Sequence, residues 1–374
     1  MSLSKDEILR YSRQIILPEF GRESQEKLKN SSVLVVGAGG LGTPLLMYLA
    51  AAGIGTIGIV DFDIVDVSNL HRQVLYGTSD LGKKKSRQAI KKLKDNNPHI
   101  NYKIFDEKLS SDNALRIFQN FDVIADGTDN FPTRYLVNDA CVLTGKVNVF
   151  ASIFQFEGQL SVFNYMGGPN YRDLFPKPPL PGIVPNCADG GVLGVLPGIL
   201  GTMQALEVIK VLSGIGEPLS GKLLLVETKD MEFRKINIQK DTDNPISGKK
   251  PLIKELIDYE EFCGLKSKKM KSIDVQEFKK WKENNKEYQL FDVREINEHT
   301  LSNLGGQHLP MSEIQNSYKE IPKSGKVILY CKSGQRSATI IKFLSEKYAY
   351  DNLINLEGGI TAWKNHFDPD LIIA

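Results

Sequence analysis

The sequence predicts an α/β protein of two domains, the first with a mostly parallel sheet and the second a small α/β domain. The chain has 374 residues, more than one typical domain needs, and 41% of them are hydrophobic. From Ser31 to about Asn148, strand-like apolar runs alternate with helix-like segments, which favours βαβ units and a parallel sheet. A polar stretch then precedes a second, shorter α/β pattern near the carboxyl end.

The elements of the first domain follow in order along the chain. The runs SSVLVV, TIGIV and FDVIAD are strand-like, and Pro44 is acceptable in the first turn of the helix TPLLMYLAAAG. LSVFNY and KLLLVET predict further strands on either side of a proline-rich loop. From Gly191 to Leu212 the chain is apolar, but Gln204, Glu207 and Lys210 recur every three residues. This stripe predicts a buried or interface helix rather than a membrane span.

The domain boundaries come from changes in composition. We expect the first domain at residues 1–245, a linker at 246–270 and the second domain at 271–374. The chain turns polar from Ile238 to Lys250, and the basic stretch KSKKMK follows at Lys266. Beyond it, YQLFDVRE, KVILYCKSGQRS and ATIIKFLSEKY provide strands and a helix for one small core.

Bulk composition excludes several classes of protein. A net charge of +2 gives no electrostatic case for nucleic-acid or membrane binding. The first residues, MSLSKDEILRYSRQIIL, have no basic-then-apolar signal pattern, and the four cysteines form no disulfide framework. We therefore expect a cytoplasmic protein.

A glycine-rich motif lies directly between the first strand and its helix. Gly37, Gly39 and Gly42 form GxGxxG, where backbone N–H groups at a helix N-terminus can approach a phosphate. Asp61 ends the next strand, where a carboxylate can accept hydrogen bonds from ribose hydroxyls. The pattern predicts a Rossmann-like nucleotide site, although NAD-dependent oxidoreductases share it.

Charged residues around this motif favour ATP over NAD. Three cations can neutralise a triphosphate, and one carboxylate can bind Mg²⁺. A neutral nicotinamide needs none of them. In the order of the chain they are Arg13, Arg72, Lys85 and Asp129.

Together these motifs resemble the MoeB/ThiF adenylyltransferases, relatives of the ubiquitin-activating enzymes. The resemblance runs from about residue 6 to residue 240, through RYSRQIILPEFG, GAGGLGTPLLMYLAAAG, VDFDIVDVSNLHRQ, TDNFPTRY and PNCADGGVLGVLPGILG. It implies that Asp61 holds the ATP ribose, that Arg72 and Lys85 hold the phosphates and that Asp129 holds Mg²⁺. Arg13 would reach the neighbouring subunit of a homodimer. The implied nucleotide site comprises Gly37, Gly39, Gly40, Gly42, Asp61, Arg72, Lys85, Asp129 and Asn130.

The same resemblance implies a protein substrate, a ubiquitin-like sulfur carrier that ends in Gly-Gly. Its carboxylate would be activated as an acyl-adenylate, which requires positioning and charge neutralisation but no side-chain base. Cys187, in the loop PNCADGG, could be exposed enough to attack the adenylate or a persulfide. In family members fused to a rhodanese, the matching cysteine forms a covalent link with the carrier. Cys141, in an apolar-periodic helix, is expected in the core instead.

Cys331 forms a second constellation. CKSGQRS follows the strand KVILY and precedes a helix, so N–H groups and Arg336 can favour a thiolate and a persulfide. This loop, with DVRE before it and LEGGITAW after it, resembles a rhodanese. A phosphatase of related architecture is the competitor, but its loop is generally one residue longer. One departure concerns substrate access, because Asn303 and Gly305 replace the histidine and proline of the usual GHIPGA-like stretch.

The predicted function is adenylation of a sulfur carrier followed by sulfur transfer to a thiocarboxylate. A cysteine desulfurase is the expected sulfur donor, and molybdopterin, thiamin, tRNA thiolation and cysteine synthesis all stay open as destinations. The alternatives are another sulfur acceptor for the rhodanese domain, an NAD-dependent oxidoreductase, and a scaffold that binds the carrier without catalysis. Cys263, in the expected linker, has no assigned partner, and packing is at least as good an explanation for it.

We also expect no structural zinc, although most relatives of the first domain bind one through two CxxC pairs. None of the four matching residues is a thiolate, so they would form a poor zinc site. Packing or hydrogen bonding would then tie the two segments, unless they are mobile. The matching positions are Asn170, Asp173, Asn244 and Ser247.

Overall fold

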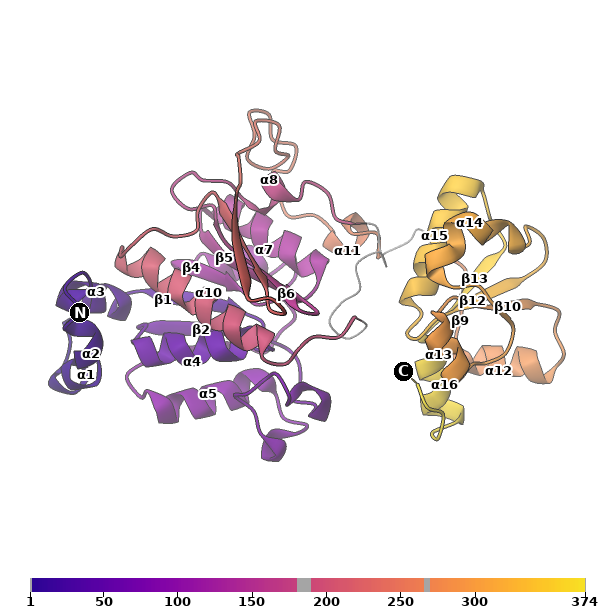
Figure 1. The fold of residues 1–374 in the computed structure, drawn as a ribbon, viewed down its shortest axis with the longest axis horizontal. Coiled ribbons are helices and arrows are strands. Elements are labelled where there is room, and N and C mark those ends of the chain that lie inside the picture. Colours follow the sequence, from indigo (N-terminus) through magenta and orange to yellow (C-terminus); the bar gives the residue numbers. More distant parts are fainter. Residues whose placement is uncertain (1, 180–189, 266–269, 374) are drawn as a thin grey trace. The chain divides into compact units, whose positions relative to one another are not determined.

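The computed structural model describes residues 2–179, 190–265 and 270–373, and the chain folds into two compact units. Apart from Pro179, the described residues up to Phe262 form the first unit, and those from Cys263 onward form the second (Figure 1). Each is an α/β structure with its own sheet and its own hydrophobic core. The predicted fold class is therefore confirmed.

The first unit is built on an eight-stranded sheet of order β3-β2-β1-β4-β5-β6-β7-β8. The five strands from β3 to β5 are parallel, and β6, β7 and β8 continue the sheet antiparallel. The strand order reverses between β1 and β4, where ligands bind in open α/β sheets. The strands are β1 Ser32–Val36, β2 Thr56–Val60, β3 Asn101–Phe105, β4 Val123–Asp126, β5 Val147–Phe154, β6 Glu157–Phe163, β7 Lys222–Glu227 and β8 Glu232–Asn237.

Helices cover this sheet because its central strands are apolar on both sides and must be buried on both faces. Helices α10, α4 and α5 pack in a row (Figure 1), and α6 and α7 pack together as a second group. The α-helices of this unit are α1 Lys5–Arg10, α2 Ser12–Ile15, α3 Gly21–Lys29, α4 Gly42–Ala52, α5 Lys85–Asn96, α6 Ala114–Phe118, α7 Phe131–Thr144, α8 Tyr171–Leu174, α10 Leu196–Ser213 and α11 Tyr259–Phe262. Short 3₁₀ turns occupy Val67–Asn69 and Thr78–Asp80.

The second unit contains a five-stranded parallel sheet of order β11-β10-β12-β13-β9. Its strands are β9 Ser272–Ile273, β10 Gln289–Asp292, β11 Gln307–His308, β12 Val327–Tyr330 and β13 Leu353–Leu356. Its α-helices are α12 Val275–Glu283, α13 Ile296–Leu301, α14 Ile314–Ser317, α15 Gln335–Tyr348 and α16 Gly359–Phe367, with 3₁₀ turns at Met311–Glu313 and Tyr318–Glu320.

Much of the segment expected as a linker packs on the first unit. Residues 246–262 belong to that unit, and Tyr259 is buried with its hydroxyl donating to Asp139 at 2.8 Å. Ser111 also donates a hydrogen bond to the carbonyl of Ile257. Cys263 follows directly and is also buried, whereas Leu252 and Leu265 of the same segment are exposed.

Two further expectations concern helices. Cys141 lies in α7 with no exposed surface, as the apolar periodicity predicts, and burial raises the pKa of its thiol well above the usual value. The apolar segment after residue 190 forms α10, which packs on α4 and β5. Among the described residues, the helices are too short or too polar to cross a membrane.

Candidate functional site

The glycine-rich turn joins β1 to α4 at the point where the strand order reverses. Gly37 has φ +92°, in the region that favours glycine, and a Cβ there would lie 3.0 Å from the carbonyl of Gly127 after β4. A Cβ on Gly42 would lie only 1.9 Å from the carbonyl of Gly37. The turn therefore closes only with glycine at these two positions, and it brings the ends of β1 and β4 together.

Asp61 ties this turn to the next strand. Its carboxylate accepts hydrogen bonds from the backbone N–H groups of Ala38 at 2.7 Å and Asp63 at 2.8 Å. Burial raises the pKa of Asp61, although the Ala38 N–H and the charge of Lys85 oppose that rise. The hydroxyl of Tyr76 donates to the carbonyl of Ala38 and fixes the turn from the other side. Asp61 is thus placed beside the turn, as the sequence predicts.

The predicted phosphate-binding cations lie at the same end of the sheet. Lys85 is buried at the start of α5, and its ammonium group is 3.0 Å from the carboxylate of Asp63. The side chain of Arg72 crosses the turn, since a Cβ on Gly40 would meet its Cδ at 3.6 Å and Pro197 at 3.1 Å. The guanidinium group of Arg72 donates to the carbonyl of Ser68.

The carboxylates after β4 differ in exposure. Asp126 is buried at the end of the strand, and burial raises its pKa although Thr128 donates to it through its amide and its hydroxyl. Asp129 is exposed and able to meet a hydrated metal ion. Asn130, also exposed, caps α7 by accepting a hydrogen bond from the backbone N–H of Thr133. The residues present fit a nucleotide and Mg²⁺: a glycine cradle, a carboxylate beside it, two cations and one exposed carboxylate.

Among the described residues of the first unit, Arg13 is a predicted site residue that lies apart from this cluster. Arg13 lies on α2 and is exposed. Cys187 lies outside the described residues.

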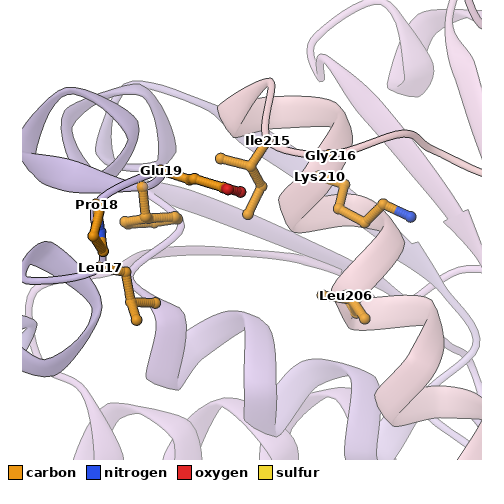
Figure 2. A pocket seen from close by; sticks show the side chains of 8 residues that line it. Leu17, Pro18, Glu19, Leu206, Lys210, Ile215 and Gly216 are labelled. Atoms are coloured by element: carbon orange, nitrogen blue, oxygen red, sulfur yellow. The ribbon is translucent and has the colours of Figure 1, made fainter.

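An apolar cavity of about 410 Å³ lies at the far end of α10 from Pro197 (Figure 2). The segment before α3 forms one wall, and the last turns of α10 together with the residues that follow it form the other. Because α10 is 18 residues long, this cavity is separate from the glycine turn. Its lining residues are Leu17, Pro18, Glu19, Phe20, Leu206, Lys210, Ile215 and Gly216.

In the second unit, Cys331 directly follows β12 and starts the predicted sulfur loop. Its side chain is buried, and its Sγ accepts a hydrogen bond from the backbone N–H of Gly334 at 3.1 Å. Ser337, in the first turn of α15, places its hydroxyl 3.5 Å from the same sulfur. The loop thus curls around the sulfur at a helix N-terminus, an arrangement suited to an anionic sulfur.

The LEGG motif packs against the backbone of this loop at Cys331. Gly358 and Gly359 both have positive φ, and a Cβ on Gly359 would lie 2.1 Å from the carbonyl of Cys331. The backbone N–H of Ile360 donates to that carbonyl at 2.9 Å. Glycine is therefore required where α16 approaches the sulfur loop.

Arg336 forms an ion pair with Glu298 of α13. The two nitrogen–oxygen distances are 2.6 and 2.7 Å, a bidentate geometry. Burial alone would raise the pKa of Glu298, but the hydrogen bonds from Arg336 outweigh it and leave that pKa lowered. Sequence reasoning missed Glu298.

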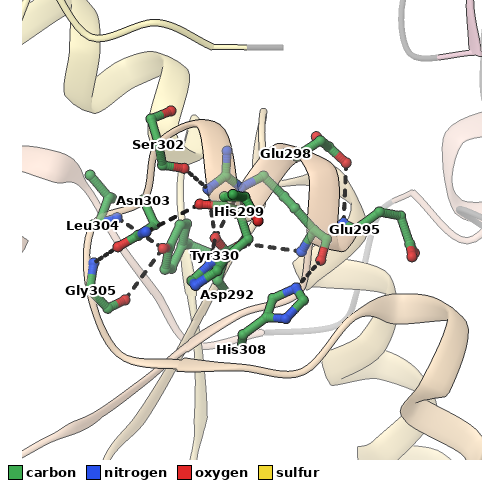
Figure 3. Close-up of polar contacts among 12 residues, drawn as sticks. Asp292, Glu295, Glu298, His299, Ser302, Asn303, Leu304, Gly305, His308 and Tyr330 are labelled. Atoms are coloured by element: carbon green, nitrogen blue, oxygen red, sulfur yellow. Dashed lines mark hydrogen bonds and ion pairs between the residues drawn. The ribbon is translucent and has the colours of Figure 1, made fainter.

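The DVRE motif forms a buried ion pair next to α13 (Figure 3). Arg294 donates to both carboxylate oxygens of Asp292, and neither side chain is exposed. His299 Nδ1 lies 2.9 Å from Asp292. Arg294 also donates to the carbonyl of Ser302 at 2.7 Å, so the pair fixes the start of the SNLGGQ stretch.

The two departures in that stretch have a structural explanation. Asn303 accepts a hydrogen bond from the backbone N–H of Gly305 and donates one to the carbonyl of His299 (Figure 3). The hydroxyl of Tyr330 bonds with the N–H of Leu304 and the carbonyl of Gly305. Hydrogen bonds between the side chains of Asn303 and Tyr330 and the backbone therefore hold the turn that the usual proline would stiffen.

The four residues that stand where most relatives would carry zinc ligands form hydrogen bonds with one another. Asn170 donates to Ser247 at 2.7 Å, and Asn244 donates to Asp173 at 2.7 Å. Asn170 and Asn244 are each 1% exposed. Hydrogen bonds therefore tie these two segments, the first of the two possibilities that the sequence left.

Comparison with known proteins places both units. The ThiF family model matches residues 11–246, and the rhodanese-like domain model matches residues 274–366. The probable adenylyltransferase/sulfurtransferase MoeZ of Mycobacterium tuberculosis is 44% identical over all of this chain and 96% of its own length. The sulfur carrier protein adenylyltransferase of Thermus thermophilus is 52% identical over 71% of this chain and 100% of its own.

Two more comparisons extend this result. The adenylyltransferase and sulfurtransferase MOCS3 of Aedes aegypti is 42% identical over 99% of this chain and 90% of its own. The crystal structure of Escherichia coli MccB with ATP shares the fold, with a TM-score of 0.57 and 22% identity over 64% of this chain and 73% of that one. The chain therefore belongs to the ThiF family, carries a rhodanese-like domain after it, and is an adenylyltransferase and sulfurtransferase.

Proposed function

We propose that the enzyme uses ATP and Mg²⁺ to adenylate the carboxyl-terminal glycine of a ubiquitin-like sulfur carrier, and then converts it to a thiocarboxylate with sulfur carried on Cys331. The observation that supports this proposal is the presence of both kinds of site in one chain. The first unit has a glycine turn with an adjacent carboxylate, and the second has a thiol whose sulfur accepts a hydrogen bond from the backbone N–H of Gly334.

In the adenylation half-reaction, the carrier carboxylate would attack the α-phosphorus of ATP, and pyrophosphate would leave. Asp61 would accept hydrogen bonds from the ribose, while Arg72 and Lys85 neutralise the phosphates. Mg²⁺, held by Asp129, would supply further neutralisation of the phosphate charge. The enzyme then contributes positioning and charge neutralisation, and this transfer of an adenylyl group to a carboxylate requires no side-chain base.

In the sulfur-transfer half-reaction, the terminal sulfur of a Cys331 persulfide would attack the acyl carbon and displace AMP. A thiol must then cleave the resulting disulfide link to free the thiocarboxylate. Cys187 is our candidate for that thiol, or for the residue that holds the carrier. A different sulfur acceptor for the rhodanese-like domain is the alternative function.

We further propose a homodimer and a cysteine desulfurase as the persulfide source. The exposed position of Arg13 supports a dimer, because an exposed arginine can reach a neighbouring nucleotide site. Three apolar side chains in the same N-terminal segment, Leu9, Ile16 and Leu17, are also exposed, at 77%, 66% and 53%, and could be buried in a dimer interface. Light scattering on the full chain should give twice the mass of one chain; a monomer at micromolar concentration would contradict the dimer.

One experiment with two variants tests the proposed function. Asp129→Ala should abolish carrier-dependent ATP–pyrophosphate exchange and leave sulfur transfer from thiosulfate to cyanide intact. Cys331→Ser should do the reverse, because a hydroxyl cannot carry a transferable sulfur, and should stop thiocarboxylate formation from a persulfide donor. Loss of both activities in either folded variant, or a full thiocarboxylate yield without Cys331, would contradict two separate sites.

A further inference from the structure

The ion pair between Glu298 and Arg336 has a consequence for the choice of sulfur donor. Arg336 is the sixth residue of the sulfur loop counted from Cys331, and it sits in the first turn of α15. Its guanidinium group would be the natural receptor for an anion that approaches the sulfur. In this chain both of its terminal nitrogens lie on the carboxylate of Glu298 instead.

The pair is well held. The side chains of Arg336 and Glu298 are 22% and 15% exposed, so solvent weakens their attraction less than at an open surface. Glu298 is itself fixed, because one of its carboxylate oxygens also accepts the backbone N–H of Glu295 at the start of α13. Glu295 in turn accepts hydrogen bonds from Ser312. Arg336 is thus neutralised by a carboxylate that cannot easily turn away.

We propose that Glu298 is a specificity-determining residue that makes the sulfur loop favour a protein or thiol persulfide over thiosulfate. This inference rests on sulfur transfer at Cys331. With thiosulfate, the Cys331 thiolate attacks the sulfane sulfur, the sulfur–sulfur bond breaks and sulfite leaves with the electron pair and two negative charges. With a persulfide, the same attack releases a single thiolate, which takes up a proton.

The two leaving groups differ in their need for a cation. A dianion that enters and a dianion that leaves gain much from an unpaired guanidinium group, whereas a thiol leaving group gains little. By neutralising Arg336, Glu298 lowers the affinity of the loop for the dianion and leaves the persulfide reaction nearly unchanged. Since the carboxylate of Glu298 bonds to Arg336 and to the amide of Glu295, its influence on the sulfur acts through Arg336.

Glu298→Gln in the full-length enzyme tests the proposal. The glutamine amide has nearly the same volume as the glutamate carboxylate but no charge. The positive charge of Arg336 beside the loop is then no longer neutralised. We expect kcat/KM for thiosulfate to rise about tenfold, mainly through a lower KM, while the rate with glutathione persulfide changes less than about threefold. The ratio of the two rates is the readout, because a loop that is merely loosened would lose both reactions.

Glu295→Gln is the matched control, since it changes a neighbouring carboxylate that contacts Ser312 and not Arg336. It should leave the donor ratio unchanged, and the melting temperatures of both variants identify any that are misfolded. If Glu298→Gln slows both donors in parallel, or leaves thiosulfate unchanged, Glu298 does not select the donor. If the unsubstituted enzyme does not react with the persulfide at all, that result would instead contradict the proposed function of Cys331.

Discussion

In the turn between β1 and α4, one added methyl group would prevent the backbone from closing around the predicted nucleotide site. A Cβ on Gly42 would overlap the carbonyl of Gly37 at 1.9 Å, and backbone cannot yield as a flexible side chain does. Gly198 of α10 is a contrast, because no atom from elsewhere in the described chain lies within 4 Å of its would-be Cβ.

We therefore expect Gly42→Ala to lower the free energy of unfolding by at least about 2 kcal/mol and to abolish ATP binding. Gly198→Ala should instead stabilise the protein by about 0.5 kcal/mol, since alanine is the better helix residue and meets no obstacle. Chemical denaturation and nucleotide-binding calorimetry measure both effects. Normal ATP binding by a fully stable Gly42→Ala would show that the turn opens more easily than these distances imply.

Some site residues could be predicted from sequence because short motifs fix their surroundings. GxGxxG between a strand and a helix fixes Gly37 and Gly42, and the end of the next strand fixes Asp61, since parallel strands end at one edge. Glu298 and Asp63 could not be found in this way. Their partners lie 38 and 22 residues away, and only the packing of α13 and α5 brings them together.

At the level of elements, α11 is anchored to α7 and α8 by a buried network. Arg172 donates to both oxygens of Asp139 at 2.7 Å, and the hydroxyl of Tyr259 adds a third hydrogen bond. Burial raises the pKa of Tyr259, so the phenol stays protonated as a donor. The sequence around residue 250 is polar and predicts a linker, but the hydrogen bond of Tyr259 and the contact of Phe262 with Tyr135 attach the segment to the first unit.

Tyr259→Phe should lower the free energy of unfolding of the first unit by about 1–2 kcal/mol, because it removes one partner from a buried carboxylate. Glu260→Gln on the same helix is the control. Its ion pair with Lys108 is exposed, so the change should stay within about 0.5 kcal/mol. Equal effects in denaturant titrations would mean that the buried network does not anchor α11.

The segment at α8 and the turn near Asn244 forms a second tie between elements. Amide, hydroxyl and carboxylate groups there satisfy one another, whereas a structural Zn²⁺ needs four strongly bound N or S ligands. We expect metal analysis of purified, untagged protein to find no stoichiometric zinc. Zinc that survives dialysis against a mild chelator would show this expectation to be wrong.

Across the whole molecule, each unit carries its own core, and the two units can be followed separately. Both tryptophans of the chain, Trp281 and Trp363, lie in the second unit. Tryptophan fluorescence therefore reports on the rhodanese-like domain alone, while circular dichroism reports on both.

Acid should destabilise the rhodanese-like domain through Asp292. Burial alone would raise the pKa of this carboxyl, but hydrogen bonds from Arg294 and His299 outweigh it and hold the pKa below its usual value. A carboxyl with a lowered folded-state pKa stabilises the fold fully above its unfolded-state value, near 4, and loses that contribution as the pH falls through the folded-state value. The melting temperature followed by tryptophan fluorescence should thus fall steeply below about pH 4.

Asp292→Asn tests this origin of the acid sensitivity. At pH 7 the variant leaves the buried guanidinium group of Arg294 without its counter-charge, which should cost about 3–5 kcal/mol in the second unit. Its remaining stability should then vary less with pH than that of the unsubstituted protein, because the titrating group is gone. Asp351→Asn, at an exposed position, should change neither quantity. If Asp292→Asn keeps the same fall of melting temperature in acid as the unsubstituted protein, other carboxylates of the domain must be responsible for the acid sensitivity.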